Sequence, residues 1–393
     1  MPAPLDGIRV LDFTRYLAGP FASMLLADYG ADVVKVESRK GREFRPAEAK
    51  RDDYFFLSAN RGKRSITLDF KTEPGRELVL RMLPHFDILI ENYRPGVMEK
   101  LGLGPVLLCE RFPRLIYCAI SGFGADGPYR DRPGFDQIAQ GMSGLMSLTG
   151  TEESGPTRAG IAISDLLAGI FAAHGVQLAL LARARTGRGQ VVDTSLLEAT
   201  IAILSWGAGM YFQSQSGQAP GPAGQHHPLS SPYGRFRAKD GYLNIAAASE
   251  AMWEKLARTL GREAWIRDPR FVDLVARLKN RDELSAEIEA VLGTQAVDVW
   301  VDRINGAGVP CGPVLDLAQV FSDPQVLARN MRVALPHPEL GTFETTGLPV
   351  KLSATPGAIE RRPPLLGEHT DEILSECGLT PEDVASLRAR KIV

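Results

Sequence analysis

The chain has 393 residues, a length that suits two domains better than one. Its 44% hydrophobic and 23% charged content is that of an ordinary globular protein, and its net charge of -2 points to neither nucleic acid nor an anionic membrane surface as a partner. The start of the chain lacks a signal-peptide pattern and the four cysteines form no CxxC pair, so we expect a cytoplasmic protein with reduced cysteines and no metal site.

Strand and helix signals alternate along the first two hundred residues. The segments GIRVLDFT, VVKVES, RSITLD, DILIEN and RLIYCAIS read as strands, while AGPFASMLLADYG and GRELVLRMLPHF have helical spacing. This alternation predicts the α/β class, with a mainly parallel sheet covered on its faces. We assign residues 1–200 to a large domain.

A glycine pattern follows the last of these strands. SGFGADG matches GxGxxG at Gly122, Gly124 and Gly127, but a dinucleotide-binding fold needs a helix to open there. The chain continues PYRDRPG, which stops a helix at once. We therefore reject a nicotinamide-dependent dehydrogenase.

The pattern changes after the first domain. We interpret residues 201–228 as a linker, because SQSGQAPGPAGQHHP is rich in Gly, Pro, Gln and Ser. Residues 229–320 are predicted to form a smaller α+β domain, with two short strands around Lys239-Asp240-Gly241 and helices from Met252 to about Ile304. Residues 321–393 return from it, with a strand at LPVKLSAT and a final helix at EHTDEILSEC.

One carboxylate interrupts the apolar stretch RAGIAISDLLAGIFAAHGVQLALLAR, which we interpret as a buried helix. If the helix starts near Ser164, Asp165 shares its face only with small residues, so a ligand or another backbone could approach closely there. These residues are Ala168, Gly169, Ala172 and Ala173. Free N–H groups at the helix start would hold Asp165 ionised. A helix-capping aspartate beside close helix packing is the other interpretation, and from this segment alone it is favoured.

The histidines receive structural interpretations. His174 lies half a turn out of phase with Asp165 and is predicted to be a satisfied core histidine. His226 and His227 have no third ligand at a suitable spacing for a metal ion.

Basic residues cluster after three of the predicted strands or beside them. Residues 38–42 (SRKGR), residues 60–64 (NRGKR) and Arg94 fall at strand ends, where open α/β sheets bind ligands. Any one of them alone would be a solvated rim. Together they favour an anionic ligand with several phosphates.

Long motifs of this chain, in order, resemble the class III CoA-transferase family. They are PLDGIRVLDFTRYLAGPFASMLLADYGADVVKVE, NRGKRSITLDFK, ILIENYRPGVMEKLGLG, SGFGADGPYRDRPGFDQIAQGMSGLMSLTG, TGRGQVVDTSLLEA, PYGRFRAKDGYLNIA and LGEHTDEIL. The family includes formyl-CoA transferase and carnitine-type CoA-transferases, and it is similar to the α-methylacyl-CoA racemases. The resemblance implies a Rossmann-like large domain built from both chain ends, an inserted small domain, and two subunits interlocked in a homodimer.

The resemblance also implies roles for individual residues. Asp165 matches the catalytic aspartate, and coenzyme A contacts are carried over to Arg15, Tyr16, Leu17, Ala18, Arg39, Lys63, Arg64, Asn92, Tyr93, Lys100 and Phe135. Ser38 stands where formyl-CoA transferase has an arginine beside the adenine, and Arg39 is taken as its substitute. A glycine-rich cover loop is placed at Gly221, Gly224 and Gln225. Coenzyme A would be a substrate, with no tightly bound cofactor.

The chemistry that such a site needs is nucleophilic. A carboxylate with an ordinary pKa of about 3.9 is ionised at neutral pH, so Asp165 can attack an acyl-CoA thioester. Racemases of this superfamily have a histidine base where this chain has Phe135, which cannot accept a proton. Asp136 is predicted to shape the site or to form hydrogen bonds. Two alternatives stay open: an acyl-CoA racemase or isomerase with Asp165 as base, and a non-catalytic CoA-binding protein.

Overall fold

The computed structural model describes residues 2–39, 54–214 and 216–393. The chain divides into two compact units, each described below by itself. The first unit lies within Met1–Met146, Arg158–Gly217 and Gln325–Val393, and the second within Ser147–Thr157 and Gln218–Pro324. The domain boundaries predicted at residues 200, 228 and 320 stay predictions.

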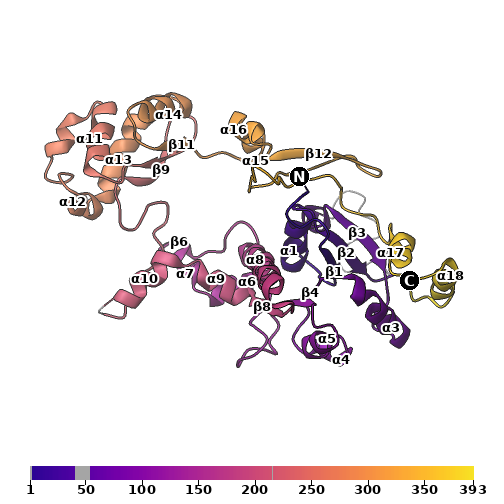
Figure 1. The fold of residues 1–393 in the computed structure, drawn as a ribbon. Coiled ribbons are helices and arrows are strands. Elements are labelled where there is room, and N and C mark those ends of the chain that lie inside the picture. The colour runs from indigo at the N-terminus through magenta and orange to yellow at the C-terminus, as the bar shows by residue number, and fades with distance from the viewer. Residues whose placement is uncertain (1, 40–53, 215) are drawn as a thin grey trace. The chain divides into compact units, whose positions relative to one another are not determined.

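A six-stranded sheet forms the centre of the first unit, in the order β3-β2-β1-β4-β5-β8 (Figure 1). All neighbouring strands in it are parallel. Its strands are β1 (Arg9–Asp12), β2 (Asp32–Glu37), β3 (Lys63–Thr67), β4 (Ile88–Glu91), β5 (Ile116–Ser121) and β8 (Val191–Ser195). The predicted parallel α/β sheet is confirmed. The strand order reverses between β1 and β4. We use the word crevice for the region beyond the carboxyl ends of these two strands, because sheets of this kind bind ligands at such a point.

Helices cover both faces of this sheet because alternate side chains of each strand face opposite ways. In β1, Val10 belongs to a core shared with α1 and α8, while Leu11 belongs to a core shared with α3, α5, α17 and α18. The helices of this unit are α1 (Ala18–Ala27), α2 (Tyr54–Ala59), α3 (Glu73–Met82), α4 (Val97–Lys100), α5 (Pro105–Arg111), α6 (Asp136–Met142), α8 (Ile163–Thr186), α9 (Leu196–Ala202), α10 (Ser205–Gln213), α17 (Thr370–Glu376) and α18 (Pro381–Ala389), with a 3-10 turn at Leu83–His85. Two short helices, α7 (Leu145–Leu148) and α16 (Pro324–Ala328), contain residues of both units.

The long helix α8 is buried on one face only. By length and composition it could cross a membrane, but its small-residue face packs in the core, as a helix of a globular protein does. Ile170, Leu178 and Leu181 are exposed on its other side. His174 is exposed as well, so the predicted core histidine is wrong. The reason is that the buried stripe of this helix is narrow and, apart from Val176 and Arg183, consists of small residues.

The second unit is built around a three-stranded antiparallel sheet in the order β11-β10-β9. Its elements are β6 (Gly150–Thr151), β7 (Gly155–Pro156), β9 (Tyr233–Arg237), β10 (Tyr242–Ala246), α11 (Glu250–Thr259), α12 (Leu274–Lys279), α13 (Arg281–Leu292), α14 (Val297–Gly306), β11 (Cys311–Pro313) and α15 (Leu317–Val320), with a 3-10 helix at Glu263–Arg267. The predicted hairpin around Asp240 and the helices after it are confirmed. Buried Trp253, Phe271 and Ile288 anchor their common core.

The C-terminal part differs from the prediction in two places. The segment LPVKLSAT forms no strand, and the pairing occurs upstream, in the hairpin of β12 (Arg332–His337) and β13 (Gly341–Thr346). Pro349 within that segment lacks the backbone donor that a central strand needs. The helix predicted at EHTDEILSEC is confirmed as α17, but it is not the final helix, because the chain turns at Gly378 with a φ of +79° and continues into α18. Helix α10 lies within the predicted linker.

Candidate functional site

The crevice between β1 and β4 is bridged by a reciprocal pair of hydrogen bonds. The backbone N–H of Arg15 donates to Oδ1 of Asn92 (2.7 Å), and Nδ2 of Asn92 donates to the Arg15 carbonyl oxygen (2.7 Å). The Arg15 guanidinium carbon also lies 5.4 Å from the ring centre of Tyr93. Arg15, Asn92 and Tyr93, predicted as ligand contacts, are thus brought together where doubly wound sheets bind ligands.

Tyr16 connects this crevice to helix α6. Its backbone φ of +63° is in the left-handed region, which is strained for a residue other than glycine. The Tyr16 ring meets the Phe135 ring edge-on, with the ring centres 5.8 Å apart. Both rings are exposed, at 40% for Tyr16 and 59% for Phe135. They form an apolar wall that is open to a ligand.

Asp165 lies in the first turn of α8, half-buried. The donors of that turn are occupied by another carboxylate, because Oδ1 of Asp136 accepts from the N–H of Ser164 (2.8 Å) and of Asp165 (3.4 Å). Among the described residues, none donates a hydrogen bond to the Asp165 carboxylate itself. The hydrogen-bonding role predicted for Asp136 is confirmed, and Asp165 is not the capping residue.

The local electrostatics oppose ionisation of Asp165. Burial raises the pKa of Asp165 to about 7, and the negative charge of Asp136 adds to the rise. The expected stabilisation of the ionised form by free backbone donors is therefore wrong, since Asp136 already accepts from those donors. At neutral pH an acid with a pKa near 7 is divided about equally between its two protonation states.

The small-residue face of α8 is filled by α1. A Cβ at Gly169 would lie 2.7 Å from the Ala18 carbonyl oxygen and 3.1 Å from Cδ1 of Phe21. Leu17 and Ala18 are buried, so their side chains are not available to a ligand. The sequence allowed either a ligand or another backbone to approach this face, and the structure shows that a neighbouring backbone occupies it.

Lys63 is a correction to the predicted phosphate contacts. Its ammonium is wholly buried and donates to Oδ2 of Asp12 (3.0 Å), the Pro20 carbonyl oxygen (2.9 Å) and Oδ1 of Asn60 (2.8 Å). These three bonds use all three donors of the ammonium. Lys63 therefore stabilises the connection between β1 and α1 from the interior of the protein.

Arg64 is the second correction. Its guanidinium is 5% exposed and is paired with three carboxylates, those of Asp32, Glu372 and Glu376. These bonds tie α17 to β2 and β3. A phosphate would have to displace carboxylates that already satisfy the guanidinium.

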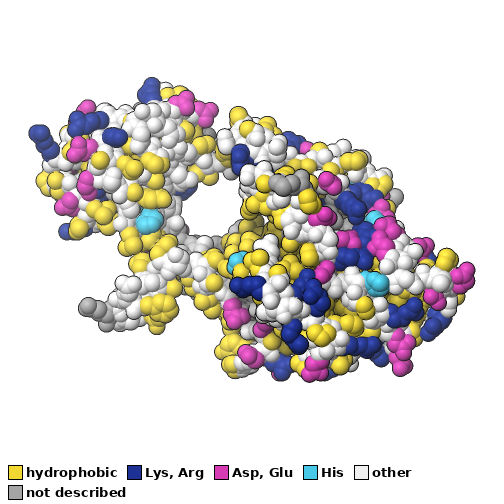
Figure 2. Space-filling model, viewed as in Figure 1, with side chains coloured by type: hydrophobic (Ala, Val, Ile, Leu, Met, Phe, Trp, Pro, Cys, Tyr) yellow, Lys and Arg dark blue, Asp and Glu magenta, His cyan; other side chains and the backbone are white. Residues whose placement is uncertain are grey.

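The exposed candidates for an anionic ligand are fewer than predicted. Arg39, Arg94 and Lys100 are exposed in the described part of the chain. The remaining members of the first basic cluster, Lys40, Gly41 and Arg42, lie outside the described residues. On the face shown in Figure 2, basic and acidic side chains are interspersed over the first unit.

The predicted cover loop lies in the second unit. Gly221, Gly224 and Gln225 are exposed, and Gly224 has a φ of +61°. The Gln225 side chain accepts a hydrogen bond from Arg235. His226 meets the Phe236 ring edge-on, and His227 stacks on Tyr233, at 5.8 and 4.8 Å between ring centres. The placement of this loop against Asp165 stays a prediction.

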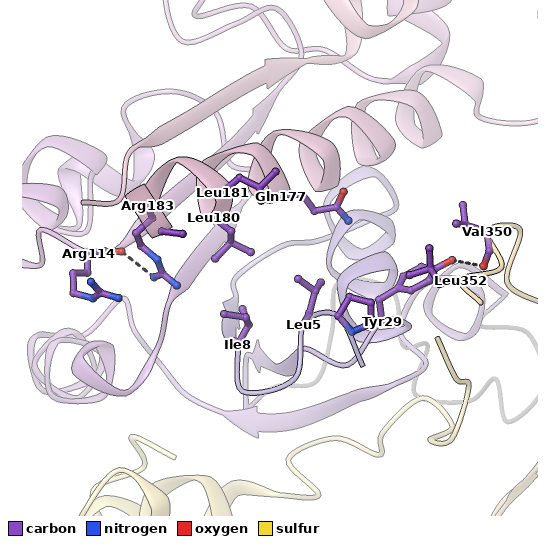
Figure 3. Close-up of a pocket in the computed structure, with 12 residues that line it drawn as sticks. Leu5, Ile8, Tyr29, Arg114, Gln177, Leu180, Leu181, Arg183, Val350 and Leu352 are labelled. Carbon is purple, nitrogen blue, oxygen red and sulfur yellow. Dashed lines mark hydrogen bonds between the residues drawn. The ribbon is translucent and has the colours of Figure 1, made fainter. Parts of the chain in front are cut away.

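An apolar pocket of the first unit lies elsewhere on α8 (Figure 3). Its volume is about 670 Å³, and it is lined by Leu5, Tyr29 and Leu180 among others, with Arg183 donating to the Arg114 carbonyl oxygen at its rim. Gln177 in its wall follows Asp165 by twelve residues, which is about 18 Å along a helix axis. The pocket is thus separate from Asp165. In the described ranges, no group of three His, Cys, Asp or Glu side chains could hold a metal ion.

Sequence reasoning missed Gln140. This fully buried residue of α6 donates from Nε2 to Oδ2 of Asp136 (2.7 Å). The available signal was the spacing of four between Asp136 and Gln140, which places two such side chains together on one helix face.

Comparison with known proteins extends over both units. A model of CoA-transferase family III matches residues 5–370. The succinyl-CoA:glutarate CoA-transferase of Mus musculus is 38% identical over 378 residues, covering 95% of this chain and 86% of the mouse protein. The succinyl-CoA–D-citramalate CoA-transferase of Chloroflexus aurantiacus is 37% identical over 398 residues, covering 100% and 98%. A solved CAIB/BAIF family protein from Brucella suis has a TM-score of 0.87 and 38% identity, covering 96% of this chain and 100% of that one.

Proposed function

This chain belongs to CoA-transferase family III and is an acyl-CoA:carboxylate CoA-transferase, and we propose that it works through a covalent intermediate on Asp165. The observation that carries the proposal is a half-buried carboxylate that accepts no hydrogen bond from the described residues and lies one helical turn before Gly169, which packs against Ala18. A carboxylate with no structural partner is available for chemistry.

Asp165 attacks in its ionised form. One of its oxygens adds to the thioester carbonyl, and the tetrahedral adduct expels the CoA thiolate, which leaves a mixed anhydride of the acyl group and Asp165. The thiolate then attacks the aspartyl carbonyl and releases the original acid as a carboxylate. The enzyme is left with a CoA thioester on Asp165. An incoming carboxylate repeats the two exchanges in reverse and leaves as the new acyl-CoA.

The residues around the crevice suit these steps. The rings of Tyr16 and Phe135 can pack against the pantetheine arm of coenzyme A. Exposed Arg39 and Lys100 are the candidates for binding the phosphates of coenzyme A. Arg15, Asn92 and Tyr93 hold the floor of the crevice. We propose that the loop with Gly221, Gly224 and Gln225 covers the anhydride and excludes water.

The substrates are proposed from the names of the relatives. The mouse and Chloroflexus proteins are named for succinyl-CoA as donor and for glutarate or D-citramalate as acceptor. We propose succinyl-CoA as the donor and a short dicarboxylic acid as the acceptor for this chain. Coenzyme A is then a substrate that enters and leaves in each cycle.

We propose that the active protein is an interlocked cytoplasmic homodimer, with the second unit as the inserted small domain. Exposed large apolar side chains on α10, such as Phe212 at 79%, support burial against a second copy. The four free cysteines suit a reducing compartment.

The covalent route is tested by intact-protein mass spectrometry after brief exposure to succinyl-CoA. We expect a CoA thioester adduct that maps to Asp165 and is absent in Asp165→Asn. Asp6→Asn is the matched control, because Asp6 is an exposed carboxylate of the same unit. If a panel of acyl-CoA donors left the wild-type protein unmodified while CoA transfer still occurred, the nucleophile assignment would be wrong.

A further inference from the structure

Two side chains of α6 hold the beginning of α8. The Asp136 carboxylate uses both oxygens: Oδ1 accepts from Ser164 and Asp165, and Oδ2 accepts from Nε2 of Gln140 at 2.7 Å. The residue that precedes α8, Ala162, has no side-chain cap of its own. The first turn of α8 is therefore capped from a different helix.

Gln140 also holds the chain that leads into α8. Its Oε1 accepts from the N–H of Ala159 at 2.9 Å, and its Nε2 approaches the Ile161 carbonyl oxygen at 3.4 Å. Its side chain is fully buried, so these bonds form away from competing water. The Gln140 amide thus holds both the capping carboxylate of Asp136 and the chain segment that precedes α8.

We infer that Asp136 and Gln140 form a positioning pair that aims the Asp165 carboxylate and sets the pH at which it can react. The inference rests on the proposed function of Asp165 as nucleophile, and it adds two residues that act through Asp165 without touching the substrate. Gln140 orients Asp136, and Asp136 both holds the first turn of α8 and places a negative charge beside Asp165.

The other charged groups near α8 are engaged elsewhere. Helix α1 carries no charged residue. On β8 and α9, Oδ2 of Asp193 accepts from Ala125, and Oε2 of Glu198 accepts from the Ser195 hydroxyl. Asp136 is the charged group that raises the pKa of Asp165 beyond the effect of burial. Removing that charge should therefore ease ionisation.

The test follows the protonation of Asp165 directly by infrared spectroscopy. The carboxyl band of Asp165 is identified as the band that each protein loses when it also carries Asp165→Asn. Asp136→Asn keeps an oxygen for the Ser164 donor but removes the charge. We expect the titration midpoint of Asp165 to fall by about one pH unit, a tenfold change in proton affinity. Gln140→Met keeps the side-chain length and removes all three polar contacts of the amide, those to Asp136, Ala159 and Ile161. We expect it to slow adduct formation at high pH by about tenfold or more, with the KM for succinyl-CoA within about twofold.

The control is Gln137→Met, because Gln137 is an exposed glutamine of the same helix. It should change neither the midpoint nor the rate. An unchanged midpoint in folded Asp136→Asn, or equal rates in the two glutamine variants, would overturn the positioning role. If Asp136→Asn shifts the midpoint but no donor ever modifies the wild-type protein, the pair stands and the covalent function fails.

Discussion

Replacing Gly169 by alanine tests the contact that sets Asp165 beside the loop of residues 15–18. The added Cβ would lie 2.7 Å from the Ala18 carbonyl oxygen, a backbone atom that cannot rotate away as a side chain would. Overpacking of this kind costs about 1–3 kcal/mol. The change from glycine to alanine within a helix gains about 1 kcal/mol. We therefore expect a net loss of up to about 2 kcal/mol.

Thermal unfolding of the first unit measures this loss, with Gly209→Ala as the matched control. Gly209 is also helical, in α10, and a Cβ there would meet nothing within 4 Å. It should gain about 0.5–1 kcal/mol, so the two variants should move the midpoint in opposite directions, by about 2–4 °C per kcal/mol. We also expect Gly169→Ala to slow adduct formation, because α8 must shift to relieve the contact. Equal stabilisation by both alanines would refute the close-packing argument.

Three further predictions concern charge and backbone strain. Because the pKa of Asp165 is raised to about 7, the folded state holds an extra proton above the unfolded value of about 3.9. Stability should thus fall as pH rises from about 4 to about 7 and level off above that, where both states are ionised. Adduct formation should slow below about pH 7, and Asp165→Asn should flatten the stability loss between about pH 5 and 7. An unchanged slope would contradict this. Lys63→Met should lose about 3 kcal/mol in urea unfolding, because it removes the ion-pair partner of the buried Asp12 carboxylate, which keeps its hydrogen bonds from Thr14 and Ser23. Exposed Lys100→Met should keep its stability and bind CoA more weakly, and the reverse pattern would restore Lys63 as a ligand contact. Gly224→Ala places a side chain at a φ of +61° and should destabilise the second unit by about 1 kcal/mol relative to Gly221→Ala. Gly221 is the control because it has open space and no such φ. Equal unfolding midpoints for the two variants would argue against strain at Gly224.

The local pattern of the sequence was enough for five of the six strands of the sheet and for the place of Asp165, whereas the sixth strand, β8, was not predicted. Five strand segments and the helix start near Ser164 follow from side-chain periods of two and of 3.6 residues, which depend only on neighbours in the chain. The crevice could also be anticipated, because Arg15 and Asn92 follow strands directly and parallel strands end at one edge.

The tertiary structure alone decided which polar groups are free. Lys63 and Lys100 have the same side chain, but the partners of Lys63 include Asp12, 51 residues away, and these remove it from solvent. Likewise, the N–H groups expected to stabilise Asp165 are taken by Asp136, 29 residues earlier. The periodicity of a sequence predicts on which face of its own helix or strand a side chain lies. The packing of elements that are remote in sequence decides which partner that side chain contacts. It therefore also decides whether a charged side chain is paired inside the protein or exposed to a ligand.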